Sequence, residues 1–161
     1  MVEKTLERIY KAKKLSCFLK IISHAAVATG VLSYFYLLYC GYKENVSVLI
    51  KMLAFSAIPF LLVSIARNFI NAKRPYEIYD FYAEKPKNKS GKSFPSRHVF
   101  SSFLIATLAY AFSPILALIL CGISIILAVC RVLLGIHFIS DVVFGALIGI
   151  FSGALTVILI Q

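Results

Sequence analysis

Apolar residues run along this chain in long blocks that short polar stretches separate. Most of the blocks reach the roughly 20 residues that a helix needs to cross the hydrocarbon layer of a membrane. The pattern predicts an all-α protein, a polytopic membrane bundle of about five transmembrane helices. The predicted spans are residues 15–42, 46–70, 94–113, 114–134 and 138–160.

Composition strengthens this prediction, because 60% of the residues are apolar and the mean hydropathy is +0.87. A water-soluble core of this length could not bury so much apolar surface. We therefore treat residues 1–161 as a single domain that lies in a membrane bilayer. Residues 1–14 alternate basic and apolar positions, which indicates a basic interfacial segment, either an amphipathic helix on the membrane surface or a solvated tail.

The chain carries a formal net charge of +10. In a soluble protein such a surplus would suggest nucleic acid, but no basic soluble module with interleaved aromatic residues is present, so we expect no nucleic-acid partner. The charge is better explained by loops that face anionic lipid head groups and by ligands for an anionic substrate.

Three polar clusters interrupt the apolar blocks at predicted helix ends. A charged residue at the centre of a spanning helix costs roughly 2.5–3.5 kcal/mol on insertion scales, so such residues usually have a function. Five spans would bring the 71–94 loop and the 131–137 turn to the same membrane surface, where all three clusters would meet. The clusters are Arg67–Pro75, Pro95–His98, and Arg131 with His137 and Asp141.

The first cluster has a helical spacing. Arg67, Asn71 and Arg74 stand at i, i+4 and i+7, which predicts one stripe along the end of the second span. Lys73 would point elsewhere, and Pro75 predicts that the helix ends near Arg74. Arginines that extend to lipid head groups are the alternative interpretation.

The second cluster opens the third predicted span. Proline is favoured in the first helical turn, so Pro95 predicts a helix start here. The free amides of that turn and the Ser96 hydroxyl could bind phosphate oxygens, and Arg97 would strengthen the site. His98 would lie within one turn of the bound anion. A capped helix with a surface histidine is the alternative.

In the third cluster, His137 and Asp141 are four residues apart at the start of the fifth span. A carboxylate at this spacing can accept a hydrogen bond from one imidazole nitrogen and leave the other as a nucleophile. Arg131 ends the preceding span at the same surface. A structural His–Asp pair is the alternative. Cations, histidines and a carboxylate together predict a phosphate site.

In order and spacing, the clusters resemble the motifs of the type-2 phosphatidic-acid phosphatase superfamily, which includes vanadium haloperoxidases. The resemblance covers residues 67–141. The first motif is Arg67, followed after six residues by Arg74–Pro75, and the second is Pro95–Ser96–Arg97–His98. The third is Cys130–Arg131, followed after five residues by His137 and after three more by Asp141. The sequence departs from the family pattern where Arg67 replaces lysine, Arg97 replaces glycine and Cys130 replaces serine.

The resemblance implies roles for these residues. His137 would be the nucleophile that forms a phosphohistidine, Asp141 would orient it, and His98 would protonate the leaving group. The phosphoryl oxygens would be held by Arg67, Arg74, Ser96, Arg97 and Arg131. The resemblance implies neither a metal nor another cofactor, since the arginines supply the positive field. Cys130 is not expected in the site, because it lacks the hydroxyl of serine.

The expected function is therefore dephosphorylation of a membrane lipid phosphate or diphosphate, of the phosphatidylglycerophosphate, phosphatidate or polyprenyl diphosphate class. A phosphatase for a small soluble ester and a non-catalytic lipid-phosphate binder or transporter are the alternatives. The expected location is a cell membrane of bacterial type. Basic residues near the first span place the site on the cytoplasmic side, whereas bacterial relatives commonly face it outward, so orientation stays open, as does oligomeric state.

Overall fold

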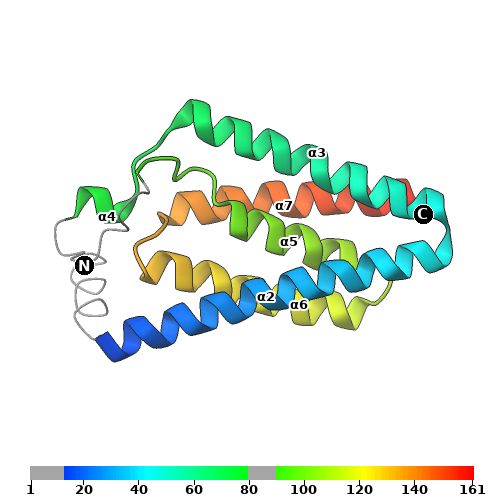
Figure 1. Ribbon diagram of the computed structural model, residues 1–161, viewed down its shortest axis with the longest axis horizontal. Helices are drawn as coiled ribbons and strands as arrows, with labels where there is room; N and C mark the ends of the chain where they lie inside the picture. The colour runs from blue at the N-terminus through cyan, green and yellow to red at the C-terminus, as the bar shows by residue number, and fades with distance from the viewer. Residues whose placement is uncertain (1–12, 80–89) are drawn as a thin grey trace.

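The computed structural model describes residues 13–79 and 90–161. All regular structure in these ranges is helical, which confirms the predicted all-α bundle (Figure 1). The predicted interfacial helix at the N-terminus falls almost wholly on residues outside the described ranges. The helices are α2 (Lys13–Glu44), α3 (Val46–Ile70), α4 (Pro75–Ile78), α5 (Arg97–Ala109), α6 (Pro114–Leu133) and α7 (Ile139–Ile160).

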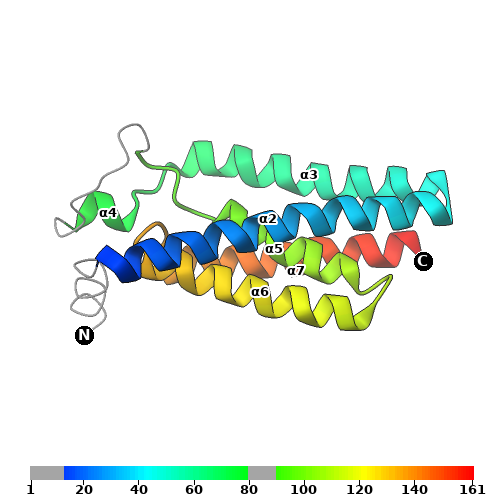
Figure 2. The ribbon, with the colours of Figure 1, turned by 60° about the horizontal axis from the view of Figure 1, so that its bottom comes forward.

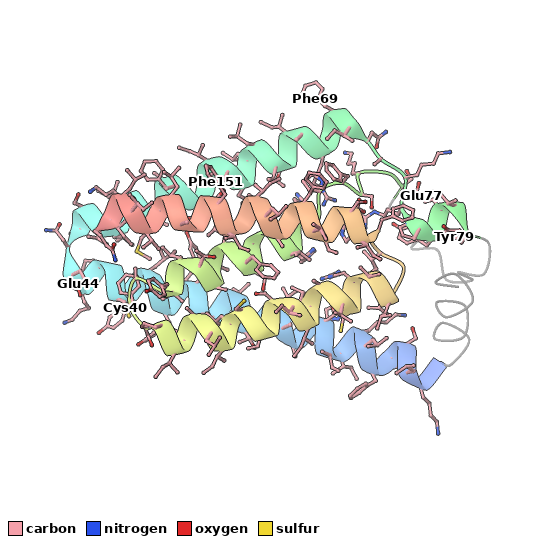
Figure 3. All side chains as sticks on the ribbon, turned by 180° about the vertical axis from the view of Figure 1, so that it is seen from behind. Cys40, Glu44, Phe69, Glu77, Tyr79 and Phe151 are labelled. Atoms are coloured by element: carbon pink, nitrogen blue, oxygen red, sulfur yellow. The ribbon has the colours of Figure 1, made fainter. Side chains whose placement is uncertain are left out.

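Four of these helices, α2, α3, α6 and α7, are long and apolar enough to cross a membrane. Their outward faces carry large apolar side chains, among them Phe69, Leu118 and Phe151, which are 86%, 75% and 72% exposed. Phe69 points away from the bundle in Figure 3. Lipid rather than water is the solvent that suits such a surface.

Helix α5 is shorter than the span predicted at 94–113. Its 13 residues extend about 20 Å at about 1.5 Å per residue, less than the bilayer core. Before it, the Ser96 amide donates to the Asp141 carbonyl oxygen at 2.9 Å, so this stretch pairs with α7 instead of continuing the helix. After it, Ser113 caps α6 by accepting from the Leu116 amide at 3.3 Å. Nine residues of α5 are buried, which makes it the central helix of the bundle.

Helix α7 approaches α5 closely through glycines at every fourth position. A Cβ atom on Gly145 would lie 2.7 Å from the Ser96 carbonyl oxygen, and one on Gly149 or Gly153 would also clash with α5. Small residues at this spacing let two helices pack backbone to backbone. The contact brings the first turns of α5 and α7 together, with His98 on one and Asp141 on the other.

The connections carrying the three clusters meet at one end of the bundle. Figures 1 and 2 show the α3–α5 connection, with α4, at the same end as the α6–α7 turn. The start of α2 lies at this end too, and the end of α7 lies at the opposite one. This arrangement positions the candidate site.

Candidate active site

A cavity of about 520 Å³ opens at the end of the bundle where the clusters meet. Six of the eight predicted site residues line it: Arg67, Arg74, Arg97, His98, Arg131 and His137. Asp141 and Ser96 lie behind this lining. The other residues around the cavity are Tyr76, Ser90, Gly91, Lys92 and Ile136.

Arg67 reaches the cavity from the last turn of α3. It is only 5% exposed, and its Nη1 donates to the Pro95 carbonyl oxygen at 2.7 Å. The predicted helical stripe through Asn71 to Arg74 is wrong, because α3 ends at Ile70 and Asn71 adopts a left-handed conformation with φ of 43°. Arg74 instead reaches the cavity from the extended segment before α4.

Arg74 is held in place by the segments that flank residues 80–89. Its Nε donates to the Gly91 carbonyl oxygen at 3.0 Å, and its guanidinium lies 5.8 Å from the centre of the Tyr76 ring. The Gly91 amide donates to Glu77 Oε1 at 2.7 Å. Gly91 has φ of 64°, and a side chain there would clash with Asn71. These contacts fix the arginine at the edge of the cavity.

The second cluster differs from its prediction at Pro95 and Ser96. Helix α5 begins at Arg97, so Pro95 precedes the first turn, and Ser96 is the fully buried residue before the helix. Ser96 Oγ has no hydrogen-bond partner among the described residues and does not line the cavity. The predicted phosphate contact of its hydroxyl therefore stays a prediction. Arg97 and His98 are exposed and line the cavity as expected.

His137 belongs to a buried hydrogen-bonded group with Asp141 and Ser93, which are 2%, 3% and 0% exposed. Asp141 Oδ2 lies 3.3 Å from His137 Nδ1 and accepts from the Ser93 hydroxyl and, at 3.0 Å, from the Phe138 amide. A proton on Nδ1 satisfies this carboxylate and leaves Nε2 with a free lone pair.

Burial also affects the charge state of His137. It lowers the pKa of the imidazole below its ordinary value, while the hydrogen bond to Asp141 acts in the opposite direction. Because burial is the larger effect, the neutral ring is the dominant form at neutral pH. A neutral ring is the form that can attack phosphorus.

The turn between α6 and α7 holds Arg131 beside His137. Gly135 has φ of 65°, a conformation that ends helices and favours glycine. The Arg131 carbonyl oxygen then accepts from the amides of Ile136 and His137, at 3.1 and 3.3 Å. Arg131 lines the cavity, and its buried Nε has no hydrogen-bond partner among the described residues. Cys130, excluded above, packs in an apolar cluster with Leu19 and Leu134.

Three residues that contact or line the site were not predicted from the sequence. Ser93 lies in a loop and Glu77 in the four-residue helix α4, so neither belongs to a helix long enough to give a spacing signal. Lys92 also lines the cavity, with φ of 54°, although it belongs to none of the three clusters. Among the described residues, no three His, Cys, Asp or Glu side chains lie close enough to hold a metal ion.

Two apolar cavities continue from this site into the bundle. The first, of about 280 Å³, shares Arg97 and His98 with the site and is lined mainly by apolar residues of α2, α3, α5 and α6. The second, of about 440 Å³, shares Phe60, Ser101 and Ile105 with the first. Together they form an apolar crevice that starts at the cationic cavity.

Comparisons with known proteins agree with this architecture. The family model of the PAP2 superfamily matches residues 48–161. The structure is similar to that of LpxE from Aquifex aeolicus, with a TM-score of 0.68 and 23% identity over 95% of this chain and 92% of that one. It is also similar to a transmembrane PAP2 type phosphatidylglycerolphosphate phosphatase from Bacillus subtilis, with a TM-score of 0.64 and 22% identity over 96% of this chain and 84% of that one. No curated protein matches the chain significantly.

Proposed function

The chain belongs to the PAP2 superfamily, and on this premise we propose that it is a membrane lipid phosphatase with a phosphohistidine intermediate. The observation that carries the proposal is the buried His137–Asp141–Ser93 group beside a cavity lined by four arginines. The names of the two similar structures, one a phosphatidylglycerolphosphate phosphatase, are consistent with it. The reaction needs no metal, because the arginines stabilise the phosphoryl charge.

In the first step, His137 Nε2 attacks phosphorus and a bond forms between them. The bond from phosphorus to the lipid oxygen breaks, and His98 gives its proton to that oxygen. Burial and the neighbouring cations lower the pKa of His98 to about 3, so its protonated form requires the negative charge of the bound phosphate. Asp141 stabilises the positive charge that develops on His137. Arg67, Arg74 and Arg131 bind the three equatorial oxygens, whose charge is greatest in the transition state.

In the second step, water attacks the phosphohistidine. His98, now neutral, accepts a proton from the water as the new bond to phosphorus forms. The bond to His137 Nε2 breaks, and inorganic phosphate leaves. His98 thus ends the cycle protonated and His137 neutral, which returns the site to its starting state.

The apolar crevice supports a lipid as the substrate. A chain bound in it would begin at Arg97 and His98, beside the cationic cavity. The head group could then stay in the cavity while the tail remains in an apolar environment. A small soluble ester has no apolar chain that could occupy this crevice.

Phosphate release from detergent-solubilised protein tests the proposal. In the presence of EDTA we expect release from at least one of phosphatidate, phosphatidylglycerophosphate and polyprenyl diphosphate, with vanadate inhibiting. Turnover of glycerol phosphate as fast as of the lipids would favour a soluble-ester phosphatase. Binding or translocation of these lipids without phosphate release would favour a non-catalytic binder or transporter, and would contradict the proposal.

A further inference from the structure

The cavity carries more positive charge than one phosphate group can balance. Its lining includes five cationic side chains and, among the described residues, no carboxylate: Arg67, Arg74, Lys92, Arg97 and Arg131. A phosphate monoester brings about two negative charges, which leaves about three of the five positive charges unbalanced. The surplus indicates a substrate with a second anionic group.

Arg97 is the cation best placed for that second group. Arg67 and Arg74 already donate to backbone carbonyl oxygens, whereas Arg97 makes no hydrogen bond or ion pair with any described residue. It is exposed, and it is near enough to Arg67 for the two charges to repel each other. An anion between these guanidinium groups would relieve that repulsion.

The position of Arg97 also says where the second anion would be in the substrate. Arg97 lines both the cationic cavity and the adjoining apolar cavity, so it stands at the junction between them. A group bound at this junction lies between the scissile phosphate and the lipid tail. Phosphatidate has only uncharged glycerol esters at that point. A lipid diphosphate has its second phosphate there, and phosphatidylglycerophosphate has its phosphodiester.

We infer that Arg97 binds a second phosphate of the substrate, and that the enzyme prefers lipids with two phosphate groups in series over lipids with one. The inference rests on the proposed function and names its substrate class. Only the terminal phosphoryl group is transferred, first to His137 and then to water. The remaining phosphate stays on the lipid, bound by Arg97, and the leaving oxygen takes its proton from His98.

Substrate preference is the test. We expect kcat/KM to be higher for polyprenyl diphosphate or phosphatidylglycerophosphate than for phosphatidate. Comparing kcat/KM for the first two lipids identifies whether the second phosphate is that of a diphosphate or that of a phosphodiester. Arg97→Gln should lower the preference for the two-phosphate lipid about 10- to 100-fold, the value of a charge-assisted hydrogen bond. Arg97→Lys should keep part of it, since charge remains but the planar fork is lost.

The matched control is Lys43→Gln, which removes an exposed positive charge in the last turn of α2 and should leave the preference unchanged. Unchanged melting temperatures would show that the variants are folded. An equal loss on one-phosphate and two-phosphate lipids would place Arg97 on the scissile phosphate and overturn the inference. An unchanged preference in Arg97→Gln would overturn it too, since Arg97 would then face only head groups.

A binding measurement separates this inference from the proposed function. Methylenediphosphonate carries two phosphorus groups that cannot be hydrolysed, and it should raise the melting temperature more than inorganic phosphate does. In Arg97→Gln, methylenediphosphonate and inorganic phosphate should raise the melting temperature equally. If this pattern appears without any hydrolysis, the proposed function fails and the second anion site stands. If hydrolysis occurs without this pattern, the site at Arg97 fails alone.

Discussion

Replacing His137 with Asn is expected to lower kcat/KM for the lipid substrate by at least about 10⁴-fold, as is usual when a catalytic nucleophile is removed. Asn cannot form the phosphorylated intermediate, although it can still accept or donate hydrogen bonds near Asp141. The cationic cavity stays intact, so the variant should still bind phosphate and vanadate. Phosphate release and thermal-shift binding, measured side by side, check both parts.

His24→Asn provides the matched control for this experiment. His24 is an exposed histidine of α2 whose ring contacts the Lys20 carbonyl oxygen, and it does not line the cavity. The same substitution there should leave activity within about twofold, the range of surface changes. Full activity in His137→Asn would exclude His137 as the nucleophile. A matching loss in both variants would indicate a general effect on the fold.

Replacing Asp141 with Asn is expected to lower kcat about 10³- to 10⁴-fold, by analogy with the loss measured for the orienting aspartate of a catalytic triad. The amide can present an N–H to His137 Nδ1, which disfavours the tautomer that leaves Nε2 free. It also removes the negative charge that stabilises the imidazolium. KM should change little, since Asp141 lies behind the cavity lining.

The pH dependence distinguishes this role from a simple shift of the His137 pKa. The hydrogen bond from His137 to Asp141 raises the His137 pKa, so its loss lowers that pKa further. The ring of Asp141→Asn is then neutral at neutral pH and above. Raising the pH should therefore not restore activity. Recovery at high pH would mean that the His137 ring of the variant is protonated at neutral pH, and would contradict this role of Asp141.

Ser93→Ala gives a graded comparison at the same carboxylate. It removes one donor to Asp141 Oδ2 and keeps the donor from Phe138. One lost hydrogen bond to a charged group corresponds to about a 10- to 100-fold loss in kcat. A loss as large as that of Asp141→Asn would mean that Ser93 itself acts on the substrate.

The sequence predicted the fold class and most of the cavity lining, because those signals are local. Apolar blocks of suitable length identify the long helices. His137 and Asp141 are only four residues apart, and they meet at the start of α7, although His137 lies two residues before the helix and not on it as predicted. Arg131 follows from the same argument, since a short turn separates it from His137. These relations depend on helix length and on short separations along the chain, both of which can be read from the sequence.

What the sequence did not predict depends on tertiary contacts. Asparagine tolerates the left-handed conformation, but nothing local indicates that Asn71 adopts it and turns Arg74 away from the helical stripe. The shortness of α5 comes from backbone pairing between Ser96 and Asp141, which are far apart in the sequence. Ser93 reaches Asp141 from a loop, so no regular spacing in the sequence predicts the contact between them.

The most direct test of the account is to trap the phosphorylated enzyme and locate the phosphoryl group. An alkyl-substituted aryl phosphate has a leaving group that departs without a proton, so His98→Ala should still be phosphorylated while hydrolysis slows. Quenching in alkaline denaturant, where phosphohistidine survives, allows the modified peptide to be identified by mass spectrometry. We predict one phosphoryl group on His137. A phosphoryl group on another residue, or steady phosphate release with no phosphoenzyme at any time, would contradict the account.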